Sequence, residues 1–117
     1  MEYLYQNCTW DREGLVTIPV MSADAKSSCW MYSYLDEPGL IVLGNLQVCP
    51  NARKEGRGKD ILRFCEDIAR KTGYERMQLK AELESWMMDW YIREGFEPLC
   101  LDTDSPEVYG WLEKSLY

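Results

Sequence analysis

The stretch Arg53-Lys54-Glu55-Gly56-Arg57-Gly58 places two glycines and three cations within six residues, shortly after the apolar run Leu40–Val48. Glycine adopts backbone angles that are closed to other residues, so consecutive N–H groups in such a turn can converge on one anion. Beyond the turn, apolar residues recur at helical spacing up to Gly73, where a helix would stop. We therefore predict a strand, a phosphate-binding turn and a helix over residues 59–71.

Two common phosphate-binding loops fit this turn badly. A Walker-type loop needs a glycine five positions before its Gly-Lys pair and a hydroxyl residue after it, but Gly58-Lys59 is preceded there by Arg53 and followed by Asp60. A dinucleotide-binding turn needs three glycines early in a βαβ unit, and only two are present here, after about three candidate strands. A third interpretation is a solvated basic loop that binds no phosphate.

Apolar periodicity and turn residues predict the remaining elements. Strands are predicted over residues 15–20, 29–35, 40–48, 76–81 and 96–101, and a second helix over 85–94. A short C-terminal helix is also predicted, because Ser105-Pro106-Glu107 is a favourable helix start and apolar residues follow at helical spacing up to Leu116. This helix would either cover the core or pack at a subunit interface in a homodimer.

The order of these segments resembles the GNAT superfamily of acyl-CoA-dependent N-acyltransferases over roughly residues 40–100. The resemblance rests on two motifs, Arg53-x-x-Gly56-x-Gly58 after a strand and Tyr91-x-x-x-Gly95-Phe96 at the end of a helix. It implies one domain over residues 1–117 with an α/β (α+β) fold. The sheet is expected to be mixed, mostly antiparallel and flanked by helices, with a shortened N-terminal half.

In this family the glycine-rich turn wraps the coenzyme A pyrophosphate with backbone amides, and the preceding strand pairs with the pantetheine arm. The resemblance therefore implies acetyl-CoA as co-substrate, no metal, and direct attack of a neutral amine on the thioester. A main-chain N–H near the end of the strand would stabilise the oxyanion. The implied coenzyme-binding residues are Leu46, Gln47, Val48, Arg53, Lys54, Glu55, Gly56, Arg57, Gly58 and Lys59.

The same resemblance makes Tyr91 the candidate acid that protonates the departing thiolate, although this side chain could equally be part of the core. The base is a carboxylate, since the chain contains no histidine. Glu82 and Glu84, at the end of the strand that is expected to splay from the one carrying the turn, are the main candidates. Asp36 and Glu37, in an earlier turn, are the alternatives, and all four could instead form a solvated acidic rim.

Charge is distributed unevenly along the chain, whose net charge is −7. Residues 53–59 hold four basic side chains and one acidic one, which leaves nine basic and nineteen acidic residues elsewhere, a net charge of −10. This acidic body would repel DNA or RNA and suits a cationic amine acceptor, either a protein lysine or a small amine. The aromatic stripe of Trp30, Tyr32 and Tyr34 could line the acceptor pocket or belong to the core.

Composition limits the cellular context. Five cysteines without a C-x-x-C pair, in a chain that lacks histidine, argue against a zinc site, and we expect them to be reduced and mostly buried. No apolar run is long enough to cross a bilayer, and the start of the chain lacks the basic residues of a secretion signal. The expected location is the cytoplasm.

Three functions remain open at this point. The first is an acetyl-CoA-dependent N-acetyltransferase. The second is a GNAT-like domain that binds acyl-CoA without transferring it. The third is an acidic inhibitor or scaffold that binds a basic partner surface and no coenzyme.

Overall fold

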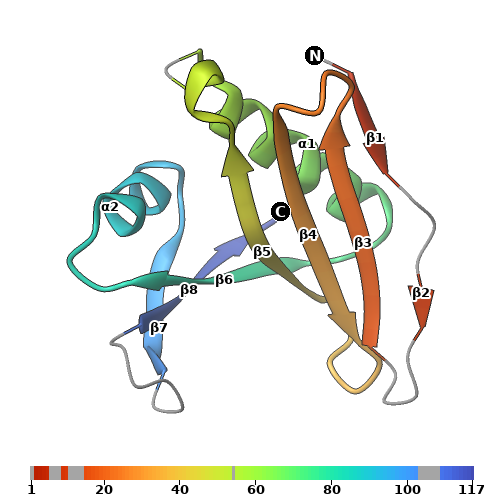
Figure 1. Cartoon of the computed structure of the whole chain (residues 1–117). Coiled ribbons are helices and arrows are strands. Elements are labelled where there is room, and N and C mark those ends of the chain that lie inside the picture. The colour runs from red at the N-terminus through yellow and green to blue at the C-terminus, as the bar shows by residue number, and fades with distance from the viewer. Residues whose placement is uncertain (1, 6–8, 11–14, 54, 103–108) are drawn as a thin grey trace.

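The computed structural model describes residues 2–5, 9–10, 15–53, 55–102 and 109–117. Within them the main chain forms a mixed sheet with strand order β1-β3-β4-β5-β6-β8-β7, and β2 pairs beside it with β3 (Figure 1). The strands are β1 Tyr3–Tyr5, β2 Thr9–Trp10, β3 Leu15–Ser22, β4 Ser27–Tyr34, β5 Leu40–Val48, β6 Arg76–Glu82, β7 Glu97–Asp102 and β8 Tyr109–Ser115. The helices are a 3₁₀ turn, η1 Pro50–Ala52, and two α-helices, α1 Arg57–Lys71 and α2 Trp86–Arg93.

All strand pairs are antiparallel except β5 with β6, which are parallel and are connected through α1. A parallel pair needs such a crossover, because its strands cannot be joined by a tight turn. This arrangement confirms the predicted α/β (α+β) class and the mixed, mostly antiparallel sheet. The predicted strands before residue 102 and both predicted helices up to residue 94 are present, with boundaries shifted by one or two residues.

The core lies between α1 and the inner face of the sheet. Alternate residues of β3 and β4 point inward, among them Val20 and Met31, and meet Ile61, Leu62 and Cys65 of α1. The stripe predicted on β4 points to the other face, where Trp30 is 39% and Tyr34 is 43% exposed. These aromatic side chains are therefore not part of the core.

The predicted C-terminal helix is wrong. Residues 109–115 form β8, which lies between β6 and β7 and pairs with both. Leu112 is fully buried within this strand, and two neighbouring strands satisfy the backbone groups that a helix would have satisfied locally. Residues 105–108, on which the helix start was predicted, lie outside the described residues. The homodimer interface that depended on this helix is no longer supported.

The sheet opens between β5 and β6. These strands pair only from Leu40 to Leu43 on β5, and β6 then runs away from β5 toward β7 and β8 (Figure 1). A β-bulge lies just beyond the last paired residue, because Trp30 faces Gly44 whereas Ser28 faces Gln47. Within the ranges that the structure describes, the end of β5 is therefore paired on one side only. Among the described residues no helix is long and apolar enough to span a membrane.

Candidate active site

A large groove of about 1040 Å³ runs from the free side of β5 to the first turn of α1. Its walls come from the end of β5, the turn after it, the β3–β4 turn and one side of α2. Among the described residues, four cations line it, namely Lys26, Arg53, Arg57 and Lys59. The groove therefore combines an exposed strand edge with a local excess of positive charge on an acidic protein.

The glycine-rich turn brings the helix start to the groove. Gly56 is the N-cap of α1 and has φ +73°, a left-handed conformation that L side chains rarely adopt. Its carbonyl accepts the first helical hydrogen bond, from the Asp60 N–H over 3.0 Å. No side chain in the described part of the chain caps the N–H groups of this first turn, and at a helix N-terminus such groups attract anions.

Gly58 lies next to the Trp90 ring beside this turn. A Cβ atom on Gly58 would lie 3.4 Å from the Trp90 ring, which is ordinary contact, so a larger side chain would have to displace the ring or fill the groove. Both residues line the groove. The missing side chain at Gly58 thus leaves the helix N-terminus accessible.

The two arginines of the turn have different partners. Arg53 donates from Nε to the carbonyl of Val48 over 3.1 Å. Arg57 pairs with Asp24 of the β3–β4 turn, with Nη2 2.6 Å from Oδ2, and with Glu55 at 3.1 Å. The Arg57 guanidinium, by hydrogen bonding, holds the pKa of the Asp24 carboxyl well below its usual range. Arg57 therefore ties the turn to the β3–β4 turn, while Lys54 lies outside the described residues.

The backbone of Val48 points into the groove. Cys49 donates its N–H to the Lys26 carbonyl over 2.8 Å, so these two residues form a hydrogen-bonded position between β4 and β5. The adjacent pair, Ser27 and Val48, is then a non-hydrogen-bonded pair, whose N–H and C=O groups point away from each other. Since β6 has already diverged, the Val48 N–H faces the open edge of the sheet.

A smaller cavity of about 370 Å³ lies where β5 and β6 separate. Leu46, Trp86 and Met87 line both this cavity and the large groove, so they mark the junction between them. Trp86 is 72% exposed, an unusual position for so large an apolar side chain. The rest of the wall is Leu43, Gly44, Asn45, Leu79, Lys80, Ala81, Glu82, Ser85, Tyr91 and Tyr109.

Tyr91 reaches the smaller cavity from α2 and is only 4% exposed. Its ring packs edge-on against Trp90 and Phe96. Burial raises the pKa of its hydroxyl well above the usual range, and the nearby Cys29 and Cys65 thiols add to the shift. The hydroxyl therefore stays protonated at neutral pH, as a proton donor must.

The candidate bases are placed differently. Glu82 lines the smaller cavity, whereas Glu84 lines neither cavity and has φ +58° in the tight turn before α2. Asp36 and Glu37 lie in the turn before β5, at the opposite end of that strand from Val48, and Glu37 pairs with Arg76 at 3.6 Å. Of the four carboxylates, the structure brings only Glu82 together with Tyr91.

Sequence analysis missed several residues of the groove. Lys26, Trp86 and Trp90 line it, and Asp24 holds Arg57, yet none of the four was named as a site residue. Their role depends on strand pairing and on the packing of α2, for which the local sequence carries no signal.

Four of the five cysteines lie among the described residues. Cys29 and Cys65 are buried, whereas Cys49 and Cys100 are exposed, and these four are free thiols. The expectation of mostly buried cysteines thus holds for two of the four described. Within the described ranges, no cluster of three or more histidine, cysteine, aspartate or glutamate side chains could hold a metal ion.

Comparison with known proteins bears on the fold. No protein-family model and no curated protein sequence matches the chain. Among solved structures, an acetyltransferase from Bacillus cereus named IAA acetyltransferase superposes with a TM-score of 0.73 at 12% identity, over 97% of this chain and 99% of its own. A protein from Desulfovibrio desulfuricans assigned to the GNAT family of acetyltransferases gives 0.75 at 14% identity, over 89% and 71%.

A third structure is the ribosomal-protein-S18-alanine N-acetyltransferase from Escherichia coli. It superposes with a TM-score of 0.67 at 16% identity, over 91% of this chain and 72% of its own. Identities this low establish the architecture and leave the chemistry to be argued from the site. The chain has the fold of the GNAT acetyltransferases.

Proposed function

We propose that this protein is an acetyl-CoA-dependent N-acetyltransferase of one domain, residues 1–117, that acts on a primary amine. The observation that carries the proposal is the continuous path from the glycine-rich start of α1, along the unpaired edge of β5, to the cavity that contains Tyr91 and Glu82. An extended coenzyme with phosphates at one end and a thioester at the other matches this path, with its phosphates at the start of α1 and its thioester at the cavity.

The phosphates would lie at the α1 N-terminus. There the N–H groups of Gly56 to Lys59 supply donors, and the Arg53 and Lys59 side chains supply charge. Arg57 and Glu55 act mainly on the shape of the turn, because Arg57 pairs with both Glu55 and Asp24. Leu46, Gln47 and Val48 would pair with the pantetheine amides as an added strand would. The bound coenzyme supplies a thioester carbonyl that is open to attack by an amine.

Three groups of the chain then have roles at the reacting atoms. The N–H of Val48 or of Leu46 would donate to the oxyanion. Tyr91 would protonate the thiolate as it leaves. Glu82, directly or through water, would take the proton from the amine, and its place in the cavity is why we favour it over Glu84. The acidic body favours a cationic acceptor, either a protein lysine or a small amine. We place the reaction in the cytoplasm.

Calorimetric titration with acetyl-CoA and with dephospho-CoA, followed by an assay for thiol release with amine acceptors, tests this proposal. We expect binding that weakens when the phosphate is removed, and turnover with at least one primary amine. Binding without turnover would favour the non-catalytic acyl-CoA-binding alternative. No binding at all would reject the enzyme and favour an acidic inhibitor or scaffold.

Replacing Glu82 with glutamine should lower kcat/KM about tenfold at neutral pH, because glutamine keeps the shape of the side chain and cannot take a proton. The measurement is the pH–rate profile of both proteins with one amine. Glu84→Gln is the matched control, since its carboxylate lies outside both cavities. Equal kcat/KM for Glu82→Gln and the unmodified protein across this profile would remove Glu82 from the mechanism.

A further inference from the structure

One buried carboxylate has no role in the proposed chemistry. Glu66 is 0% exposed in the middle of α1. Arg63 Nη1 donates to its Oε2 over 2.5 Å, and Lys114 Nζ lies 2.5 Å from its Oε1, a close ion pair that is not a well-directed hydrogen bond. Moving charges from water into a protein interior costs free energy, and well-packed apolar residues in the same place often stabilise the fold equally well or better. Stability alone is therefore a weak reason for this arrangement.

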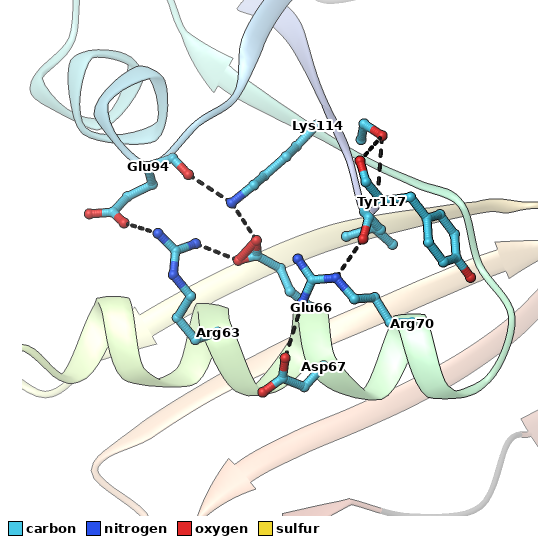
Figure 2. A network of polar contacts seen from close by, with 9 residues as sticks. Arg63, Glu66, Asp67, Arg70, Glu94, Lys114 and Tyr117 are labelled. Atoms are coloured by element: carbon cyan, nitrogen blue, oxygen red, sulfur yellow. Dashed lines mark hydrogen bonds and ion pairs between the residues drawn. The ribbon is translucent and has the colours of Figure 1, made fainter.

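Both cations also contact the end of α2, as Figure 2 shows. Arg63 Nη2 donates to the Glu94 carboxylate over 2.7 Å. Lys114 Nζ donates to the Glu94 backbone carbonyl over 2.9 Å. Glu94 is the C-cap of α2, where a helix leaves carbonyls without internal partners and a cation is favourable. Glu66 thus orients two donors that hold one helix end.

The helix needs such anchors, because eight residues are too few for a helix to be stable alone. Its N-terminal end is capped by the Ser85 hydroxyl, which accepts from the Met88 N–H over 3.2 Å. At the other end, Gly95 leaves the space that Lys114 needs, because a Cβ there would lie 3.2 Å from the lysine Cε. The lysine and the glycine are therefore matched to each other.

Tyr91 lies within the same anchored end. Its carbonyl accepts from the Phe96 N–H over 3.1 Å, and its ring packs edge-on against the Phe96 ring. Lys114 Nζ lies 5.8 Å from the centroid of that Phe96 ring. A shift of Lys114 would therefore reach the helix end and the ring that supports Tyr91 together.

We propose that Glu66 and Lys114 are positioning residues that, together with Arg63, fix the C-terminal end of α2 so that Tyr91 faces the smaller cavity. The effect on turnover rests on the proposed function. The anchoring of the helix does not, and it can be measured without any activity.

The experiment compares two variants that differ in stability. Lys114→Met leaves Glu66 buried with one partner fewer, and we expect Tm to fall by about 10 °C or more. Glu66→Leu/Lys114→Met replaces both charges with apolar groups, so Tm should return to within about 4 °C of the original value.

The decisive readouts are amide hydrogen exchange at Glu94, Gly95 and Phe96, and kcat. In the double variant we expect exchange about tenfold faster and kcat about tenfold lower than in the unmodified protein, although Tm has recovered. If the network serves stability alone, exchange and kcat recover together with Tm, and the proposal is overturned. If the unmodified protein shows no turnover, the proposed function fails while the exchange result still decides this inference.

Two further variants complete the design. Asp67→Asn breaks the exposed pair with Arg70 on the same helix, shown in Figure 2, and should leave Tm, exchange and kcat unchanged. Glu94→Gln weakens the contact with Arg63 while leaving Glu66 its two partners, so it remains informative if the double variant is unstable. We expect it to speed exchange of the same amides about threefold, and unchanged exchange would count against the proposal.

Discussion

Tyr91→Phe should lower kcat about a hundredfold, because a positioned general acid typically contributes two to four orders of magnitude to a rate. The substitution keeps the ring that packs against Trp90 and Phe96 and removes only the buried hydroxyl. Stability and the affinity for acetyl-CoA should therefore stay close to those of the unmodified protein. Steady-state kinetics with a saturating amine, together with calorimetry, measures the two effects separately.

Tyr109 provides the matched control, since it also lines the smaller cavity but comes from β8. We expect Tyr109→Phe to change kcat by no more than about threefold, because this substitution alters packing or polarity in the cavity and does not remove an acid. If the large loss follows Tyr109→Phe and Tyr91→Phe keeps the original rate, the acid role belongs to Tyr109 and Tyr91 is a core residue.

Gly58→Leu should raise the Kd for coenzyme A about thirtyfold, the equivalent of losing one or two charge-assisted hydrogen bonds at the start of α1. The leucine side chain would either displace Trp90 or occupy the groove, because the first added carbon is already in contact with the ring. Calorimetric titration gives the Kd, and thermal unfolding shows whether the fold is intact.

Gly58→Ala separates crowding from other effects at this position. A single Cβ makes only ordinary contact with Trp90, and alanine favours a helix over glycine by up to about 1 kcal/mol. The alanine variant should therefore be slightly more stable and bind coenzyme nearly as the unmodified protein does. Equal affinity for coenzyme in the leucine variant would mean that the phosphates bind elsewhere.

Much of the fold follows from short-range patterns. The turn from Arg53 to Gly58 and the helix after it were predictable, since a left-handed glycine, helical spacing and a stop at Gly73 are all local features. The strands predicted over 40–48 and 76–81 likewise followed from apolar runs between turn residues. The order of these segments, through its resemblance to the GNAT superfamily, predicted the mixed sheet.

Other parts of the candidate site depend on residues that are distant in sequence. The pairing of Arg57 with Asp24, the exposure of the Val48 edge and the separation of Glu82 from Glu84 arise only when β4, β5 and β6 are assembled. No local sequence pattern predicts these features, because each of them depends on segments that the chain brings together only on folding.

The C-terminal segment shows the same limit. Residues 109–115 carry apolar residues that suit a helix and a strand almost equally, and the open edges of β6 and β7 stabilise the strand through hydrogen bonds on both sides. From the amino-acid sequence alone follow the turn and its helix, because local hydrogen bonding and periodicity specify them, while the fold class followed from the resemblance of the segment order to the GNAT superfamily. The β8 strand, the two cavities and the anchoring of Tyr91 by Glu66 and Lys114 come from packing between distant segments, where long-range contacts outweigh local preference.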